Sequence, residues 1–326
     1  MRESVCCTPM RLDFLKMQGL GNDFLVFDAP PATYHSVDSN VLRALADRHT
    51  GIGFDQALML EAPRDTHTRV FYRVFNSDGG EVEQCGNGAR CVAALMYARQ
   101  PELGREISME SAGGLVHARV RENGMVSVDM GIPNFDPRSL SMETAGLGPA
   151  GRGAAGLGAA GGGAAGVGAP TGGTAGPKAS GEASPGEAPV YSLEIDGAAI
   201  EFGAVSMGNP HVVLRVPDVK TAPVERFGPT IERHRAFAKR TNVGFMQVVD
   251  RSRIKLRVYE RGAGETQACG TGACAAVAFG ARRDWLDPEV RVDLPGGSAI
   301  VDWSGPGQHI WLTGPATMVF TGSIDI

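Results

Sequence analysis

An internal repeat is the feature of this sequence that most restricts its fold. When the second half of the chain is shifted back by 184 positions, residues 257–273 align with residues 73–89, and 8 of the 17 positions are identical. Both segments end in the same turn, Cys-Gly-x-Gly-Ala, which begins at Cys85 and at Cys269. At a different offset, residues 21–26 resemble residues 208–213. A repeat of this length, far longer than the period of a solenoid, predicts two similar domains that face each other.

The hydrophobic pattern predicts the same order of elements in both halves. Residues 68–75 and 253–259 alternate as strands do. A helix is expected over about 41–49, with Asp38 or Ser39 as its N-cap and Gly51 after its end, and apolar residues at helical spacing follow each Cys-Gly-x-Gly turn. Since strands outnumber helices, we predict an α+β fold of two similar domains. Each is a curved, mostly antiparallel sheet around a central helix, with the active site in the cleft between them.

One segment lies outside the repeat. Residues 145–189 contain 16 glycines, 13 alanines and 5 prolines, with no aromatic residue. Such a segment has little to bury, so we expect a flexible insertion between strands near 126–130 and 191–195 that leaves the site intact. The predicted organisation is an N-terminal extension (1–9), an N-terminal half (10–132), the Gly/Ala-rich insertion (145–189), a C-terminal half (190–314) and a final segment that returns to the N-terminal half (315–326).

Charge and hydrophobicity exclude several classes of function. The chain has 31 Lys and Arg against 36 Asp and Glu, a formal net charge of −5, so a basic surface for nucleic acid is not expected. No stretch approaches the ~18 consecutive apolar residues of a membrane span. Residues 1–18 lack the apolar core of a signal peptide. We therefore expect a cytoplasmic protein with neither nucleic acid nor membrane as a partner.

The six cysteines fall into three pairs, at positions 6 and 7, 85 and 91, and 269 and 274. None of the pairs has the two-residue gap of a zinc knuckle, and a chain of this length without a signal peptide is not expected to carry a disulfide framework. We expect reduced thiols and no metal. Cys91 and Cys274 lie one helical turn beyond the other members of their pairs, where the helix faces the core, and are predicted to be small buried hydrophobic residues.

The two Cys-Gly-x-Gly turns indicate the chemistry. A cysteine followed by two glycines and a helix lies at the helix N-terminus, where unpaired N–H groups and the positive end of the dipole suit a carboxylate. The same field favours a thiolate and is expected to lower the thiol pKa from ~8.5 toward neutrality. The turn at Cys85 and the turn at Cys269 therefore each combine an acid–base sulfur with a carboxylate cradle.

Two such turns on facing domains would place one carbon between two sulfurs. A thiolate on one face could remove a proton while a thiol on the other face returns one, which inverts the stereocentre without a cofactor. An alternative role is redox switching through a Cys85–Cys269 disulfide. A phosphate-binding loop is disfavoured because the Gly-Lys-Ser/Thr ending is missing.

Eight motifs extend this pattern along the chain, apart from its first residues and the insertion. They are Lys16-Met-Gln-Gly-Leu-Gly-Asn-Asp-Phe24, Gly53-Phe-Asp-Gln56, Phe75-Asn-Ser-Asp-Gly79, Cys85-Gly-Asn-Gly-Ala-Arg-Cys91, Met207-Gly-Asn-Pro-His211, Thr241-Asn-Val-Gly-Phe245, Tyr259-Glu-Arg-Gly262 and Ala268-Cys-Gly-Thr-Gly-Ala-Cys274. Together they resemble the diaminopimelate epimerase family, the cofactor-independent epimerases of lysine and peptidoglycan precursor synthesis.

The resemblance implies conversion of L,L-2,6-diaminopimelate to the meso isomer without pyridoxal phosphate. It makes Cys269 the proton acceptor and Cys85 the proton donor in that direction, an order that the residues alone leave open. Arg261 suits a carboxylate, Glu260 an ammonium group, and asparagines a zwitterion. His211 and Glu260 are expected beside the thiols as supporting groups. The implied substrate-binding residues are Asn22, Gln56, Asn76, Gly86, Asn87, Asn209, Asn242, Glu260, Arg261, Gly270 and Thr271.

Three departures from the family accompany the resemblance. The family starts near the first motif, so Met10 is an alternative start. The insertion is atypical. The family forms homodimers with a tyrosine near the C-terminus, and here Phe320 takes its place.

Two other functions remain open: a proline or hydroxyproline racemase, which would carry a histidine where Asn87 stands, and a non-catalytic dithiol sensor or metabolite-binding protein.

Overall fold

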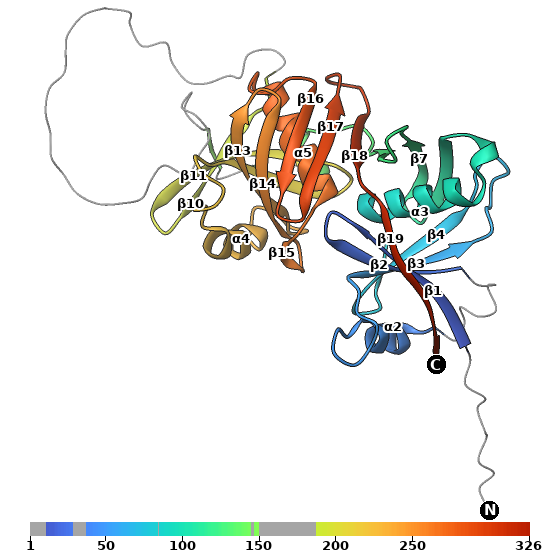
Figure 1. Cartoon of the computed structure of the whole chain (residues 1–326). Helices are drawn as coiled ribbons and strands as arrows, with labels where there is room; N and C mark the ends of the chain where they lie inside the picture. The colour runs from blue at the N-terminus through green and yellow to red at the C-terminus, as the bar shows by residue number, and fades with distance from the viewer. Residues whose placement is uncertain (1–10, 29–36, 84, 145–146, 150–186) are drawn as a thin grey trace, which may run out of the picture. The chain divides into compact units, whose positions relative to one another are not determined.

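The computed structural model describes residues 11–28, 37–83, 85–144, 147–149 and 187–326 (Figure 1). The chain forms two compact units. Unit 1 takes its described residues from Met1–Gly131, Arg291–Ser304 and Gln308–Ile326, and unit 2 from Ile132–Val290 and Gly305–Gly307. Strand β16 (Glu289–Leu294) crosses the boundary between them.

Unit 1 is built mainly from antiparallel strands. The order of pairing is β19-β1-β2-β3-β4-β6-β7-β8-β18-β17, and the short β5 pairs with β4. The pairs β2–β3 and β4–β6 are parallel. Its elements are β1 (Arg11–Gly19), β2 (Asn22–Phe27), α2 (Ser39–Ala46), β3 (Gln56–Glu61), β4 (Phe71–Asn76), β5 (Glu81–Val82), α3 (Gly86–Arg99), a 3₁₀ turn (Pro101–Leu103), β6 (Glu106–Ser111), β7 (Gly114–Val120), β8 (Val126–Asp129), β17 (Gly297–Trp303), β18 (Ile310–Gly314) and β19 (Thr317–Asp325).

Helix α3 is the centre of unit 1. Its residues Cys91, Val92 and Leu95 join one buried cluster with side chains of the strands, among them Val74 of β4 and Val116 of β7. Figure 1 shows α3 beside these two strands. A helix that buries so much of its surface is held by tertiary packing rather than by its own propensity. The predicted central helix after Cys85 is therefore confirmed.

Unit 2 repeats this arrangement. Its described strands pair in the order β9-β10-β11-β12-β13-β14-β15, and among these pairs β12–β13 is parallel and the others are antiparallel. Its elements are a 3₁₀ turn (Pro137–Leu140), β9 (Gly148–Pro149), β10 (Val190–Ile195), β11 (Ala198–Ser206), β12 (Pro210–Arg215), α4 (Val224–Glu232), β13 (Asn242–Asp250), β14 (Arg253–Glu260), β15 (Gly264–Thr266) and α5 (Gly270–Arg282).

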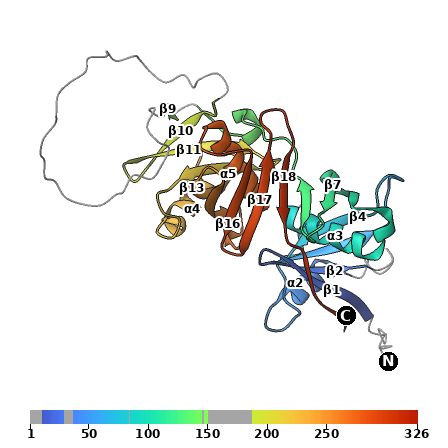
Figure 2. The same ribbon diagram turned by 45° about the horizontal axis from the view of Figure 1, so that its top comes forward.

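Helix α5 is the central helix of unit 2 and lies among β11 and β13 (Figure 2). Ala273 through Phe279 are completely buried, as expected of a helix that is apolar on every side. Gly203 allows β11 to approach helix α5 closely, since a Cβ at this position would lie 2.2 Å from the ring of Phe279. The second predicted central helix, after Cys269, is thus also confirmed.

The internal repeat is visible in the topology. Strands β1 to β5 and helices α2 and α3 correspond to β11 to β15 and helices α4 and α5, in the same order. In each unit the strand that begins at the Gly-Asn motif is followed by a crossover helix and a parallel partner strand, β2 with β3 and β12 with β13. Parallel neighbours need such a crossover. The predicted α+β fold of two similar halves is confirmed.

One predicted helix is shorter than expected. Asp38 caps α2 by accepting hydrogen bonds from the backbone of Asn40 and Val41. The helix ends at Ala46 rather than near His49. The reason is Asp47, whose carboxylate accepts hydrogen bonds from the backbone N–H groups of His49 and Thr50 and thereby turns the chain out of the helix.

The division into units differs from the predicted domain bounds at the C-terminal end. Sequence reasoning assigned 190–314 to one half, whereas 291–304 and 308–314 group with unit 1. The physical reason is that β18 pairs with β8 over four residues, and β17 pairs with β18. The last strand, β19, pairs with β1 from Gln18 to Arg11, so residues 317–325 also lie on unit 1.

The predicted insertion has ordered ends. Residues 150–186, like residues 1–10, lie outside the described residues. Before the gap, β9 pairs with β10 through Tyr191 and Ser192. After the gap, Ala188 is fully buried and Glu187 forms an ion pair of 2.5 Å with Arg283. Residues 147–149 and 187–189, which the prediction included in the flexible insertion, therefore belong to unit 2.

The helices are all short in the part of the chain that the structure describes. None of them combines the length and the hydrophobicity that crossing a bilayer would take.

Candidate active site

Both candidate catalytic cysteines lie immediately before a central helix. Cys85 is the N-cap of α3 and Cys269 is the N-cap of α5, each with an extended backbone (φ −140° and −110°). Neither sulfur caps its own helix. The first turn of each helix, with its backbone N–H groups and the positive end of the dipole, therefore begins directly at the cysteine. This confirms the predicted placement of both cysteines at helix N-termini.

The glycines of the turns are required for packing. A Cβ at Gly86 would lie 2.9 Å from Met130, and one at Gly88 would lie 3.1 Å from Leu58. In unit 2, a Cβ at Gly272 would lie 3.2 Å from the sulfur of Cys269. None of the three has a positive φ. Glycine thus lets the start of each helix approach its sheet closely.

In unit 1, the strand register gathers the predicted polar residues. Asn22 starts β2, Gln56 starts the parallel strand β3, and Asn76 lies opposite Gln56 at the end of β4. The Gln56 amide donates to Asn76 Oδ1 at 2.9 Å. Gln56 Oε1 is buried and has no hydrogen-bond partner among the described residues, so this acceptor is available to a ligand.

Asn22 links these residues to the cysteine turn. Its Oδ1 accepts from Asn87 Nδ2 at 3.3 Å and lies 3.9 Å from the Cys85 sulfur, with the thiol as donor. Asn87 is buried, and Cys85 is half-buried. The structure therefore brings together Asn22, Cys85 and Asn87 in one half-site, next to the pair of Gln56 and Asn76.

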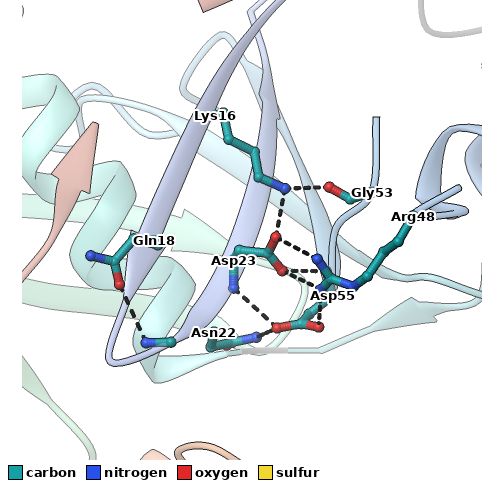
Figure 3. Close-up of polar contacts among 8 residues, drawn as sticks. Lys16, Gln18, Asn22, Asp23, Arg48, Gly53 and Asp55 are labelled. Atoms are coloured by element: carbon teal, nitrogen blue, oxygen red, sulfur yellow. Dashed lines mark hydrogen bonds and ion pairs between the residues drawn. The ribbon is translucent and has the colours of Figure 1, made fainter. Parts of the chain in front are cut away.

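A network of charged residues contacts this half-site through Asn22 (Figure 3). Asp55 accepts from Asn22 Nδ2 at 2.9 Å, and Arg48 bridges Asp55 and Asp23 at 2.7 Å to each. Lys16, which is almost buried, forms an ion pair of 2.6 Å with Asp23. Burial alone would raise the Asp23 pKa, but its hydrogen bonds and charges with Arg48 and Lys16 outweigh burial and lower it to about 2.

In unit 2, Cys269 has a different environment. Its sulfur lies 3.6 Å from Thr271 Oγ1, and the residue is only 4% exposed. Asn209 donates from Nδ2 to Thr271 Oγ1 at 3.4 Å, and its Oδ1 lies 3.0 Å from Nε2 of the buried His211. The predicted residues Asn209, His211, Cys269 and Thr271 thus form one connected half-site.

Asn242 and Arg261 lie on the adjoining strands of unit 2. Asn242 is paired with His211 in the β12–β13 register, donates to Pro210 O at 3.1 Å, and accepts from Arg261 N at 2.9 Å. The Arg261 side chain is exposed and donates to Lys239 O at 3.1 Å. Asn242 therefore fixes the backbone at Arg261, while the guanidinium group stays accessible to a carboxylate.

The pKa of Cys269 differs from the prediction. The sequence led us to expect a thiol pKa lowered by the helix dipole, but burial and then the negative charge of Glu260 raise the pKa of Cys269 well above its usual value. The Thr271 hydroxyl and the Gly272 N–H oppose this rise. His211 is also affected by burial, which together with Arg261 lowers its pKa to about 3 and keeps the imidazole neutral.

Cys91 and Cys274 are not part of either half-site. Both are completely buried, and the four described cysteines all carry free thiols. Burial raises the pKa of Cys91 to about 12. The prediction that these two residues are packed as small hydrophobic side chains is confirmed.

Sequence reasoning missed the residues that support the half-sites. Lys16, Asp23 and Asp55 stand inside two of the quoted motifs but received no role, and Glu232, a buried carboxylate that accepts from Gly262 N at 3.2 Å, was not considered. The sequence did offer one sign of these residues: a charged residue stands where the hydrophobic pattern predicts a buried side chain. Lys16 alternates with apolar residues in a strand, and charged residues are rarely buried without a partner.

Comparison with known proteins agrees with this geometry. A family model described as diaminopimelate epimerase matches residues 14–135 and 203–319 and leaves the insertion unmatched. The diaminopimelate epimerase of Pseudomonas syringae pv. tomato is 44% identical over 317 residues, which cover 97% of this chain and 100% of the relative. Those of Pseudomonas entomophila and Azotobacter vinelandii are 45% and 43% identical over the same coverage.

Solved structures share the fold at much lower identity. A hydroxyproline epimerase from Agrobacterium vitis has a TM-score of 0.57 and 12% identity, with 97% of this chain and 93% of that chain covered. A probable proline racemase from Agrobacterium radiobacter has a TM-score of 0.59 and 13% identity, with 96% and 92% covered. At such identities the likeness concerns the fold alone. The repeated cysteine turns, the matched family model and the full-length relatives together show that the chain belongs to the diaminopimelate epimerase family.

Proposed function

We propose that this protein is an isomerase of amino-acid biosynthesis that converts L,L-2,6-diaminopimelate to meso-diaminopimelate, in the route to lysine and peptidoglycan precursors. The observation that carries the proposal is the pair of cysteines at the N-termini of two equivalent central helices, each beside an asparagine of a Gly-Asn motif. The relatives that match the whole chain are named diaminopimelate epimerases, which supports this substrate.

The reaction is a two-base proton transfer, and it needs both half-sites on one α-carbon. The Cys269 thiolate takes the α-proton, and the electron pair of the broken C–H bond moves toward the carboxylate. Cys85 then gives its thiol proton to the opposite face, forming the new C–H bond and leaving Cys85 as the thiolate. The proton count balances, so neither pyridoxal phosphate nor a metal is required.

The helix N-termini supply the electrostatic part of the mechanism. Backbone N–H groups of Gly86 and Asn87 and of Gly270 and Thr271 hold the reacting carboxylate, where negative charge grows in the transition state. The buried position of Cys269 makes its thiolate a stronger base than an exposed one, since burial disfavours the charged form. The substrate ammonium offsets the charge of Glu260 when it binds.

The remaining polar residues hold the rest of the substrate. Gln56 Oε1, which has no partner among the described residues, accepts from the substrate ammonium group, and the exposed guanidinium of Arg261 donates to the distal carboxylate. His211 and Glu260 support the thiols. Substrate contacts are also assigned to Asn22, Asn76, Asn209 and Asn242.

We further propose a cytoplasmic homodimer that forms through β19. This strand pairs with β1 on one edge and exposes three consecutive large apolar residues, Met318, Val319 and Phe320, at 55%, 55% and 47%. Such a group of exposed apolar side chains on a terminal strand is typical of an interface. Sedimentation velocity of the wild type and of Phe320→Glu tests this assembly, and a monomeric wild type contradicts it.

Deuterium exchange tests the reaction. The reduced protein is incubated in deuterated water with L,L-diaminopimelate, and deuterium at the α-carbon is followed by mass spectrometry. We expect uptake with the wild type, none with the double variant Cys85→Ala/Cys269→Ala, and no change on adding pyridoxal phosphate. Equal uptake by the double variant overturns the proposal in favour of a non-catalytic dithiol protein. Uptake into L-proline or trans-4-hydroxy-L-proline instead favours the racemase that the fold also permits.

A further inference from the structure

The orientation of the Asn22 amide is fixed by a carboxylate. An ionised carboxylate only accepts hydrogen bonds, so the end of the amide that faces Asp55 must be the NH₂ group. The carbonyl oxygen therefore faces the other way, toward Cys85 and Asn87.

Asp55 is itself held rigidly. Its Oδ2 also accepts from Asp23 N at 3.0 Å, and its Oδ1 accepts from Arg48 at 2.7 Å. Asp23 returns the contact, since its Oδ1 accepts from Asp55 N at 3.0 Å, and Lys16 anchors Asp23 from the buried side (Figure 3). Two carboxylates that are each bonded to the other's backbone and share one guanidinium leave Asp55 little freedom to turn away.

We propose that Asp55 is a positioning residue that holds the Asn22 carbonyl toward Cys85, so that the amide accepts the thiol hydrogen and Cys85 rests as the thiol. This inference rests on the proposed function, in which Cys85 gives a proton to the substrate. A hydrogen bond that is accepted from the neutral form favours that form. A reversed amide would aim two N–H donors at the sulfur and favour the thiolate instead.

Two titratable groups that interact electrostatically with Cys85 do not change charge near neutral pH. Tyr72 of β4 and Cys91 of α3 interact electrostatically with Cys85, and burial raises the pKa of both, that of Cys91 to about 12. Arg90, buried on α3 beside Cys91, keeps its positive charge. A change in the titration of Cys85 is therefore attributable to Asn22 and Asp55 when only these are altered.

Among the residues of unit 2 that the structure describes, no carboxylate contacts the equivalent asparagine, Asn209. Asn209 contacts the imidazole of His211 and the hydroxyl of Thr271, and each of these groups can either donate or accept. Its amide is therefore not fixed by an acceptor-only group. An asparagine amide that is fixed by a carboxylate is therefore found in the half-site of the proposed proton donor, Cys85.

The decisive substitution is Asp55→Asn. Arg48 carries a charge and competes for the single carbonyl oxygen of the new side chain, which turns the new NH₂ group toward Asn22. The Asn22 amide must then reverse to accept from it, and its own NH₂ group turns toward Cys85. The rate of Cys85 alkylation by iodoacetamide, measured against pH by mass spectrometry of the peptide, reports the thiolate fraction and does not need catalysis.

We expect Asp55→Asn to lower the midpoint of Cys85 alkylation by about one pH unit, roughly a tenfold rise in thiolate near pH 7. In the Asn22→Ala background the same substitution is expected to cause little shift. The matched control, Glu106→Gln, removes one carboxylate and its ion pair with Arg119 elsewhere in unit 1 and leaves the midpoint unchanged.

Two results overturn the proposal. One is a wild-type midpoint in Asp55→Asn, and the other is an equal shift with and without Asn22, which means that the charge of Asp55 acts directly through space. If Asp55→Asn does not fold, Arg48→Gln, which frees Asp55 to turn, is expected to shift the midpoint in the same direction by a smaller amount. If Cys85 proves dispensable for exchange, the proposed function fails while the alkylation result still decides the role of Asp55.

Discussion

Asn22 is the first residue of β2 and Asn209 directly precedes the equivalent strand β12, yet the two residues turn opposite ends of their amides toward the cysteine turns. Asn22 presents Oδ1 to Cys85 and Asn87. Asn209 presents Nδ2 to Thr271 in the turn of Cys269. The backbone that carries them is the same in both units, with a Gly-Asn strand, a crossover helix and a parallel partner strand.

The comparison shows that the repeat gives both units the same backbone arrangement around the cysteine, whereas side chains that the repeat does not share set the polarity around each sulfur. Asn22 has Asp55 behind it, whereas Asn209 has the neutral His211. Cys85 faces a carbonyl acceptor and is half-buried, whereas Cys269 is buried beside a hydroxyl and the charge of Glu260. Two equivalent sulfurs thereby lie in different environments, one beside a carbonyl acceptor and one beside a hydroxyl and a carboxylate.

The largest effect is expected from removing either thiol. Cys85→Ser and Cys269→Ser each replace the sulfur with a much weaker acid, so we expect kcat to fall about a hundredfold or more, ~2.7 kcal/mol of barrier. Steady-state epimerisation measures this loss. The matched controls Cys91→Ala and Cys274→Ala alter the buried cysteines one helical turn further on and should keep kcat within about tenfold, ~1.4 kcal/mol. A serine variant that retains most of the activity would mean that one half-site is not catalytic.

A smaller effect is expected in the pH dependence of the stability, because unit 2 has a buried histidine where unit 1 has a phenylalanine. The offset that aligns Asn22 with Asn209 also aligns Phe24 with His211, so His211→Phe gives unit 2 the residue that unit 1 already has. The folded pKa of His211 lies at about 3, below its usual value of 6.5. As pH falls below 6.5, the unfolded chain takes up a proton that the folded chain refuses, and stability decreases.

We therefore expect the wild type to lose about 2 kcal/mol more than His211→Phe in the free energy of unfolding between pH 7 and pH 5. Urea denaturation at the two pH values measures both differences, and other titrating groups cancel in the comparison. An identical pH dependence for the two proteins would show that His211 is protonated inside the fold.

The smallest effect is expected from shortening the insertion. Replacing residues 150–186 with a short Gly-Ser linker keeps β9, Glu187 and Ala188, which belong to unit 2. We expect kcat to stay within about tenfold of the wild type, ~1.4 kcal/mol. Removing all of 145–189 also deletes the buried Ala188 and the ion pair with Arg283, so this variant should be less stable in thermal unfolding. A large loss of kcat in the shorter deletion would place the insertion at the substrate.

The sequence by itself determined the elements and their repetition. Alternation along the strands, helical spacing after Cys85 and Cys269, and the apolar faces at Cys91 and Cys274 are all carried by residues close in the chain. The N-cap at Asp38 is likewise local. Short-range periodicity and capping decide secondary structure, so these features were readable without coordinates.

Only the tertiary structure decided the chemistry of each half-site. The Asn22 amide takes its orientation from Asp55, 33 residues away, and faces Cys85, 63 residues away. The pKa of Cys269 rises because burial and Glu260 outweigh the helix N-terminus, and the grouping of 310–314 with unit 1 depends on β8. Hydrogen-bond polarity and desolvation depend on which distant groups come into contact, and local sequence patterns do not record those contacts.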